Sequence, residues 1–298
     1  MRLHPILLAL AIFLLAGCSA TGALNAVTPS SSYTLNANVA YGEHPRQKLD
    51  VYAPTASQPP AGWPVIVFFY GGSWNTGERT QYQFVGEALA ARGVLTLVAD
   101  YRLYPEVRYP DFLSDSAQAL AFGLDHAVRL GGDQKSVYVM GHSAGGYNAA
   151  MLALDSRWLQ ATGHRPNELA GRIGLAGPYD FLPIVNQDAK PVFFHPNYPE
   201  NSQPIQFAAA DAPRSFLAAA ENDKLVNPQR NSVQLANQLK AAGVPVTLKL
   251  YPHASHTTLI GAFAWPLQWI APVLDDVQAF VGSTSNEQQP AVGRRVAP

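Results

Sequence analysis

Short apolar runs alternate with longer amphipathic segments along most of the chain. We expect strands where several apolar residues follow one another, as in VIVFFY at Val65–Tyr70. An uninterrupted apolar run is typical of a strand that is covered on both faces. We expect helices where apolar residues recur at helical spacing. The other predicted strands are Asn38–Tyr41, Lys48–Tyr52, Val94–Ala99, Val137–Met140, Ile173–Ala176, Ser215–Ala220 and Val246–Tyr251, and the predicted helices are Phe84–Arg92, Phe112–Leu130, a helix opening at Gly146, Pro228–Ala242 and Pro266–Phe280.

This alternation predicts an α/β domain at residues 38–282, with a mostly parallel sheet flanked by helices. The first two strands have no helix between them, so an antiparallel start is expected. Residues 181–212 are rich in proline, have no long period, and are expected to form a short cap or lid over the sheet. Residues 283–298 are polar and are expected to form a disordered tail.

The first residues have the pattern of an export signal. Arg2 precedes an apolar core at Ile6–Leu15 that is too short to span a bilayer comfortably. The LAGC sequence ending at Cys18 resembles the lipobox of bacterial lipoproteins. That resemblance implies removal of residues 1–17 as a lipoprotein signal peptide and lipid on Cys18, with several acyl chains forming a stable membrane anchor. The alternative is an ordinary signal peptide with an incidental cysteine.

The lipobox resemblance also places the protein in the bacterial cell envelope. Ser19 follows the cysteine, where an aspartate is the usual signal for retention, so the outer membrane is the expected destination. Residues 18–37 are rich in Ala, Ser, Thr and Asn and have no apolar period. We therefore expect them to form a flexible tether between membrane and domain.

Composition narrows the class of partner. The 298 residues are 48% hydrophobic and carry a formal net charge of −1 with no basic run, which disfavours nucleic acid as a partner. Because Cys18 is the only cysteine, an internal disulfide or a thiolate metal site is excluded. No cofactor or metal site is predicted. His253 and His256 are three residues apart, but their proline-containing loop argues against a helical ligand pair.

The clearest chemical motif lies within Ser136–Asp155, where an apolar strand leads into Gly141-His142-Ser143-Ala144-Gly145 and then an alanine-rich helix. In this strand–turn–helix setting, G-x-S-x-G places a serine hydroxyl on a sharp turn above the edge of a sheet. Gly141 and Gly145 leave room for the turn because they lack a Cβ. The simpler interpretation is a glycine-rich turn with a structural serine.

A serine hydroxyl becomes a good nucleophile only with a base, and the base needs an orienting acid. The expected chain order is serine, acid, histidine. His256, just after the last predicted strand, is the predicted base, and His253 is the alternative. Asp223, in the turn after the preceding strand, is the predicted acid, and Glu221 is the alternative.

Attack on an ester carbonyl creates an oxyanion that needs backbone N–H donors, each worth about 3 kcal/mol. The amide of Ala144, directly after the serine, is one predicted donor. Gly72 and Ser73, in the loop after VIVFFY, are the others, and a plain tight turn is the alternative interpretation of this loop. Trp74 is expected either to wall the acyl site or to lie in the core.

These motifs carry a family resemblance over roughly residues 38–281. Tyr70-Gly71-Gly72-Ser73-Trp74 resembles the H-G-G-x-W box of carboxylesterase and hormone-sensitive-lipase-like α/β-hydrolases, which include kynurenine formamidases and feruloyl or acetyl esterases. The GHSAGG sequence around Ser143 is similar to their nucleophile turn. The resemblance implies the α/β-hydrolase fold. Tyr70 departs from the box, where a histidine usually braces the loop by hydrogen bonding.

The sequence thus predicts a carboxylesterase-type serine hydrolase, acting on small or short-acyl esters through an acyl-enzyme. Ser143 attacks, His256 transfers the proton and Asp223 orients His256. Its expected partners are a small ester and, through Cys18, the membrane. An arylformamidase that cleaves amides of the N-formylkynurenine type is one alternative. A non-catalytic lipoprotein with a hydrolase fold is another, supported by Tyr70.

Overall fold

The computed structural model describes residues 20–287 of the chain. The predicted signal peptide, the lipidation site Cys18 and most of the predicted tail lie outside this range and stay predictions. Among the described residues, every helix is too short or too polar to cross a membrane.

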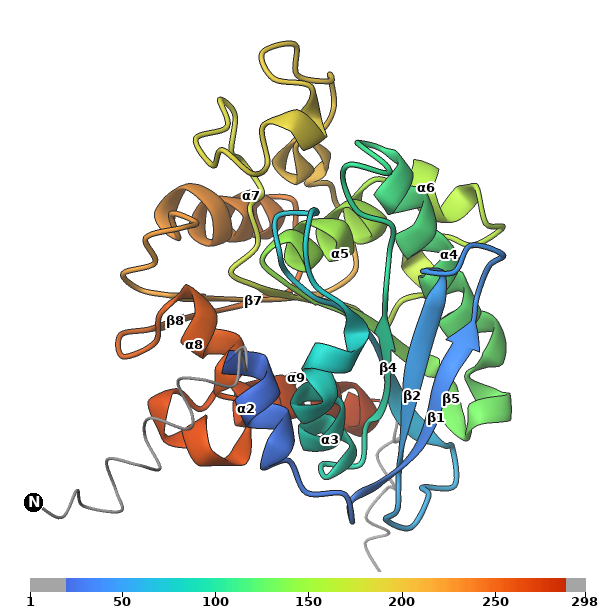
Figure 1. Ribbon diagram of the computed structural model, residues 1–298. Coiled ribbons are helices and arrows are strands. Elements are labelled where there is room, and N and C mark those ends of the chain that lie inside the picture. Colours follow the sequence, from blue (N-terminus) through green and yellow to red (C-terminus); the bar gives the residue numbers. More distant parts are fainter. Residues whose placement is uncertain (1–19, 288–298) are drawn as a thin grey trace, which may run out of the picture.

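An eight-stranded sheet runs through the centre of the molecule (Figure 1), in the order β1-β2-β4-β3-β5-β6-β7-β8. Strand β2 pairs antiparallel with β1 and β4, and all other neighbours are parallel. The predicted mostly parallel sheet with an antiparallel start is therefore confirmed. The strands are β1 (Tyr33–Ala40), β2 (Lys48–Pro54), β3 (Trp63–Phe69), β4 (Leu95–Ala99), β5 (Gly132–His142), β6 (Gly171–Leu175), β7 (Ser215–Ala220) and β8 (Val246–Tyr251).

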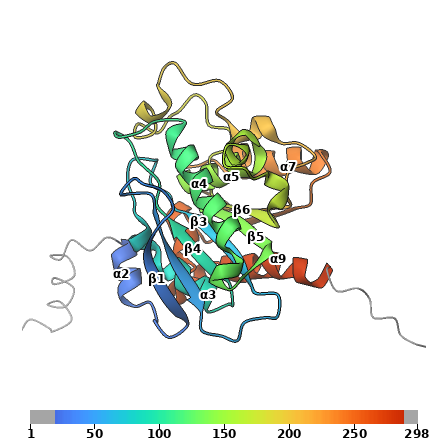
Figure 2. The same cartoon turned by 90° about the vertical axis from the view of Figure 1, so that its right-hand side faces the viewer.

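Helices cover both faces of the sheet (Figure 2). Helices α3 and α9 lie on one face, and α4, α5 and α7 lie on the other. The α-helices are α2 (Ala20–Ala26), α3 (Gln83–Ala90), α4 (Asp111–His126), α5 (Ala144–Leu154), α6 (Arg157–Gln160), α7 (Gln234–Ala241), α8 (His256–Gly261) and α9 (Val273–Glu287). The short 3₁₀ helices used below are η1 (Arg79–Tyr82), η4 (Pro191–Phe193), η5 (Pro204–Phe207) and η7 (Trp265–Ile270).

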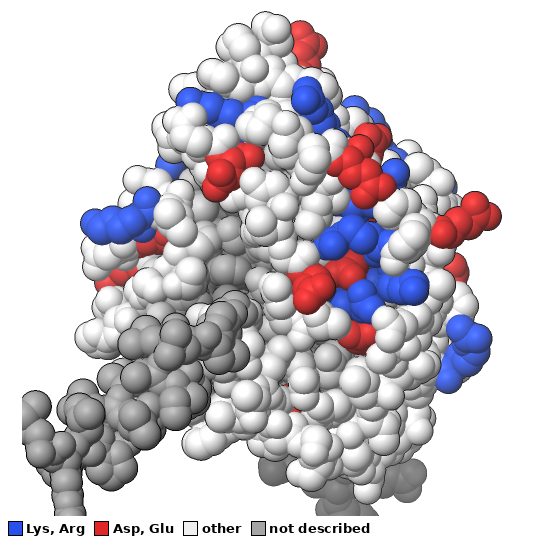
Figure 3. Space-filling model, viewed as in Figure 1, with Lys and Arg blue, Asp and Glu red and all other residues white. Residues whose placement is uncertain are grey.

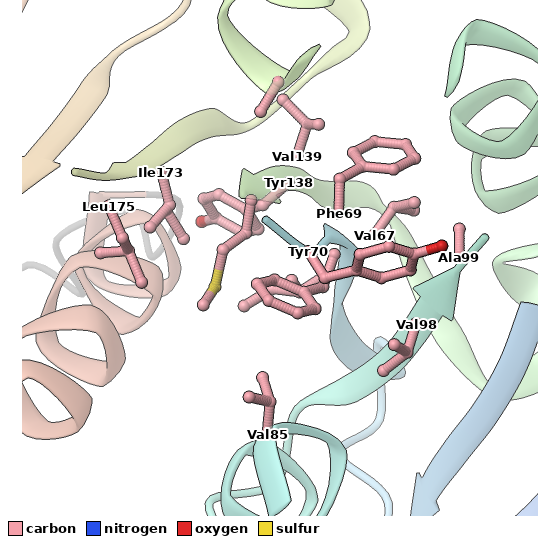
Figure 4. Close-up of a cluster of buried hydrophobic side chains, with 14 of the residues drawn as sticks. Val67, Phe69, Tyr70, Val85, Val98, Ala99, Tyr138, Val139, Ile173 and Leu175 are labelled. Carbon is pink, nitrogen blue, oxygen red and sulfur yellow. The ribbon is translucent and has the colours of Figure 1, made fainter. Parts of the chain in front are cut away.

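The core lies between the sheet and its two helical layers. Figure 4 shows side chains of β3, β4, β5 and β6 packed together, including Val67, Val98, Val139 and Ile173. All four are fully buried. Burying one such side chain contributes about 1.5–3 kcal/mol to stability. The central strands are therefore a rigid support for the loops that follow their carboxyl ends. The predicted helix at 266–280 is instead η7 followed by α9. Pro272 stands between them, and proline lacks the N–H that a continuous helix needs.

The structure corrects the prediction of a flexible tether for the described residues 20–37. Residues 20–26 form α2, and strand β1 begins at Tyr33. No side chain of α2 is fully buried, and Tyr33 is the one buried residue of β1. Both elements therefore lack the apolar pattern on which the prediction relied. Strand β1 is instead held through backbone pairing with β2. The predicted tail is also shorter, because α9 continues to Glu287.

Residues 181–212 leave the sheet after β6 and lie at one end of the molecule, in yellow at the top of Figure 1. They contain only irregular loops and the short helices η4 and η5. Phe181 and Phe193 turn inward and pack against Trp74. This is the segment for which the sequence predicts a cap.

Candidate active site

Ser143 lies on a strained turn between β5 and α5. Its φ of +54° is in the left-handed region, which non-glycine residues rarely adopt. The turn is crowded, because a Cβ added to Gly141 would lie 2.0 Å from the carbonyl oxygen of Gly145. A Cβ added to Gly145 would lie 2.0 Å from the carbonyl oxygen of Phe69. Both positions therefore require glycine.

Three side chains that are distant in sequence form one hydrogen-bonded chain. The Nε2 atom of His256 lies 2.8 Å from the Oγ of Ser143, and its Nδ1 lies 2.7 Å from Oδ2 of Asp223. Nδ1 donates to the carboxylate, so Nε2 is free to accept the serine proton. Asp223 follows β7 and His256 follows β8, so the carboxyl ends of neighbouring parallel strands bring them to one edge of the sheet.

The two alternative residues do not join this chain. His253 and Glu221 are both exposed, whereas His256 and Asp223 are buried. The short helix α8 explains the difference between the histidines. Ser255 caps its first turn by accepting a hydrogen bond from the Thr258 amide, and His256 is the first residue of the helix. The cap directs the His256 ring inward.

The surroundings of Asp223 favour its ionised form. Burial opposes ionisation, but the hydrogen bond from His256 and those from the amides of Leu225 and Val226 outweigh it. Together these donors hold the pKa of Asp223 below its usual range. The carboxylate can therefore orient the imidazole and balance a positive charge on it.

His142, the residue before Ser143, also lies at the site and lines the same cavity as Ser143 and His256. Its Nε2 donates a 2.9 Å hydrogen bond to the backbone carbonyl of His256, and the two rings are 5.0 Å apart. Its buried Nδ1 has no hydrogen-bond partner among the described residues. Sequence reasoning missed this contact, although the position of His142 beside the serine could have suggested it.

The buried His142 should make stability depend on pH. Burial, reinforced by the neighbouring His256, lowers the pKa of His142 to about 3. An unfolded histidine titrates near about 6.5. Between these two values the unfolded chain binds a proton that the folded chain does not. The free energy of unfolding should therefore fall with falling pH, by about 1.4 kcal/mol per pH unit from this group. The contribution is fully present above the unfolded value.

Urea unfolding at pH 7, 6, 5 and 4 measures this dependence. In the His142→Asn variant, the free energy of unfolding should depend less steeply on pH than in the parent protein. The slope should decrease by the contribution of about one proton. Parallel curves for the two proteins would show that His142 is not held neutral by the fold.

The loop after β3 is the second strained segment of the site. Gly72, Ser73 and Trp74 have φ values of +127°, +50° and +59°. Within residues 20–287, the amides of Ser73 and Ala144 donate no hydrogen bond. The loop is held from the opposite side by Asn186, whose side-chain amide donates to the Ser73 hydroxyl at 2.9 Å. No sequence signal pointed to Asn186.

Tyr70, the residue before this loop, is held in place by hydrogen bonds and ring stacking. Its buried hydroxyl donates to Oδ1 of Asp100 at 2.6 Å and accepts from Arg46 at 2.8 Å. Asp100 also pairs with the Arg79 guanidinium. The Tyr70 ring stacks on Tyr82 and Tyr101, at ring-centre distances of 5.3 and 5.0 Å. The hydroxyl therefore fixes the residue at which the loop begins by bonding to Asp100 and Arg46.

Trp74 is buried in the core, as one of the two expectations for it proposed. Its indole N–H donates to Oδ1 of Asn148 at 2.9 Å, and its ring packs against Tyr147 and Phe193 in the core. The same residue lines a small cavity beside Ser143.

Two cavities meet at Ser143, and both are also lined by Ser73 and Leu225. The smaller has a volume of about 80 Å³ and is walled by Trp74 and Ala144. The larger has a volume of about 480 Å³. A third cavity, of about 720 Å³, lies between α4 and α6 and contains no residue of the hydrogen-bonded chain. Its size therefore does not make it the reaction site. No group of metal-ligating side chains is present in the described part of the chain.

The sheet order, the helices on both faces and the turn at Ser143 define the α/β-hydrolase fold. Residues 49–239 match the family model named BD-FAE. The chain belongs to this family. A solved structure of an inhibited esterase B from Lactobacillus rhamnosis superposes with a TM-score of 0.74 at 20% identity, covering 96% of this chain and 98% of that one.

Two curated relatives indicate the range of the family. The chain is 27% identical over 243 residues to the isoprenylcysteine alpha-carbonyl methylesterase of Arabidopsis thaliana, covering 74% of this chain and 56% of the relative. It is 26% identical over 229 residues to the kynurenine formamidase of Salmo salar, covering 75% of each. The chain spans little more than half the length of the plant methylesterases that it matches.

Proposed function

We propose that this protein is a serine hydrolase that cleaves small, short-acyl carboxylic esters through an acyl-enzyme intermediate. The observation that carries the proposal is the chain of hydrogen bonds from Ser143 through His256 to Asp223, at the junction of two cavities. A nucleophile, a base and an orienting acid are the three groups that this chemistry requires.

In the first step, the Ser143 oxygen bonds to the ester carbonyl carbon while its proton passes to Nε2 of His256. The tetrahedral intermediate then collapses, the bond to the alcohol oxygen breaks, and His256 returns the proton to that oxygen. A water molecule next attacks the acyl-enzyme and gives its proton to His256. The second tetrahedral intermediate then collapses, the bond between the acyl carbon and the Ser143 oxygen breaks, and His256 returns the proton to that oxygen as the carboxylic acid leaves.

The negative oxygen of each intermediate needs donors that are already in place. We assign this role to the amides of Ala144, Gly72 and Ser73. The free amides of Ala144 and Ser73 and the strained backbone of residues 72–74 support the assignment. The brace at Tyr70 supports a catalytic protein over a binding module, because it holds the donor loop where the family's box places a histidine.

The comparisons support the hydrolase class, since the relatives are named as an ester hydrolase and a formamidase. The formamidase relative covers three quarters of both chains, so an arylformamidase is the second candidate. The same serine, base and donors would act on a formamide carbonyl. Relative turnover of N-formylkynurenine and p-nitrophenyl acetate separates the two activities.

The experiment that tests the proposal combines a rate and a covalent label. We expect the folded protein to hydrolyse p-nitrophenyl acetate and butyrate. We also expect a fluorophosphonate probe to modify the peptide that contains Ser143, as located by mass spectrometry. A folded protein that neither turns over these esters nor accepts the probe would favour the non-catalytic alternative.

A further inference from the structure

The larger cavity beside Ser143 has a wall that the hydrolase core does not supply. Ala20, Thr21 and Leu24 of α2 line it, together with Ser143 and His256. Figure 1 shows α2 beside α8 and α3. The family model matches residues 49–239, so α2 lies outside the matched segment, as does α8 with His256. The N-terminal helix therefore completes this cavity from outside that segment.

Specific contacts hold α2 in position. The Asn25 side chain donates to the Thr80 carbonyl at 2.7 Å and accepts from the Phe84 amide at 3.3 Å. Leu24 packs against the hydrophobic core. Just after the helix, the Val27 carbonyl accepts a 2.8 Å hydrogen bond from the Trp265 indole. These contacts join the N-terminal segment to η1, α3 and η7, so Leu24 has a defined place in the cavity wall.

The position of His256 indicates which part of an ester enters each cavity. In the proposed reaction His256 gives its proton to the departing alcohol oxygen, so the alcohol must leave on the side of this ring. His256 lines the larger cavity and is not part of the lining of the smaller one. The proposed oxyanion donors lie between the two cavities, because Ala144 lines only the smaller, Gly72 only the larger and Ser73 both. Since the alcohol group takes the side of His256, the acyl group belongs in the smaller cavity.

We propose that α2 forms the wall of an apolar subsite for the alcohol group, with Leu24 as a residue that determines specificity. This inference rests on the proposed function and names its substrate class: short-acyl esters of bulky, uncharged, apolar alcohols. A volume of about 80 Å³ admits only a few carbon atoms on the acyl side, against about 480 Å³ on the alcohol side.

The lining of the larger cavity fits an apolar group. Leu24, Phe84 and Ile260 contribute apolar surface, and neither cavity is lined by an Asp, Glu, Lys or Arg among the described residues. In Figure 3, charged side chains of both signs are interspersed on the face shown, without a large patch of one sign to attract a charged substrate. The alcohol group is therefore selected by its shape and by apolar contact.

Two isomeric esters test the direction of binding. Hexyl acetate carries the six-carbon chain on the alcohol side, and methyl heptanoate carries it on the acyl side. The intrinsic reactivities of these alkyl esters are similar. We expect kcat/KM to be at least about tenfold higher for hexyl acetate. Its six-carbon chain enters the larger cavity, whereas the chain of methyl heptanoate would have to enter the smaller one. Equal values, or a preference for methyl heptanoate, would overturn the assignment of the two cavities.

Substitutions in α2 test the role of the helix. Leu24→Trp should fill part of the alcohol subsite and lower kcat/KM for hexyl acetate by about tenfold, mainly through KM, while ethyl acetate changes by less than about twofold. Ala23→Trp is the matched control, because Ala23 is exposed on the same helix and does not line the cavity. It should leave both rates unchanged. Equal effects of the two tryptophans would refute the proposal.

A second variant covers the case in which Leu24→Trp fails to fold. Leu24→Ala enlarges the cavity and should raise the ratio of decyl acetate to hexyl acetate turnover by at least about threefold. An unchanged ratio would count against Leu24. Activity on ethyl acetate separates the two levels of the argument. If it persists in every variant but selectivity does not move, the α2 subsite is wrong. If no ester is cleaved by the parent protein, the proposed function is wrong and the subsite falls with it.

Discussion

Replacing Ser143 by alanine should lower kcat on p-nitrophenyl acetate by on the order of 10⁶-fold, because the atom that bonds to the acyl group is removed. The fold should survive, since alanine differs from serine only by the hydroxyl and meets the same backbone geometry at φ +54°. Steady-state rates, together with thermal unfolding of both proteins, measure the two effects separately. The variant should also lose labelling by a fluorophosphonate.

Ser114→Ala provides the matched control for this substitution. Ser114 is exposed on α4, and it lines the cavity between α4 and α6 rather than either cavity at the site. Its removal should leave kcat within about twofold of the parent value, as expected for a surface substitution. If Ser143→Ala retained the kcat of the parent protein, another group would be responsible for hydrolysis and the proposed mechanism would be refuted.

Replacing His256 by alanine should have an effect of the same order, because the serine hydroxyl then has no base and the leaving alcohol has no acid. His253→Ala is a stringent control, since it removes an imidazole three residues away on the same loop. His253 is exposed, whereas His256 contacts both Ser143 and Asp223. The control should retain kcat within about twofold.

The double variant adds a further test of the hydrogen-bonded chain. Residues that act as one catalytic unit have non-additive effects. Removing Ser143 and His256 together should therefore cost about as much as removing either one. A loss in the double variant equal to the product of the two single losses would mean that the residues act independently. A large effect of His253→Ala would instead transfer the role of base to the alternative histidine.

The parts of the fold that were predictable have strong local signals. Strands β7 and β8 occupy the predicted residues, because each is a short run bounded by turn-forming residues. The turn at Ser143 was predictable because it places glycine at fixed positions on either side of the serine. Gly141 has no space for a Cβ against Gly145, and Gly145 has none against Phe69 of β3. Although the second contact is long-range, both requirements leave a short pattern in the sequence.

The N-terminal helix had no such signal. Helix α2 has a single large apolar residue, Leu24, and its place depends on Asn25, which donates a hydrogen bond to Thr80 and accepts one from Phe84. These partners are more than 50 residues away, so nothing in the local pattern distinguishes this segment from a tether. The contact of His142 with the His256 backbone is likewise long-range, so no local pattern indicates it.

The chain order of serine, acid and histidine could be predicted from the sequence, and so could the alternation of strands and helices. Both depend on strand periodicity and turn chemistry, which are local properties. The sequence favoured Asp223 over Glu221 and His256 over His253 but left both alternatives open, because the members of each pair are only a few residues apart. Tertiary packing distinguishes them by burying Asp223 and His256 and exposing the other two. The shape of the two cavities is also a product of packing, because segments from opposite ends of the domain build their walls.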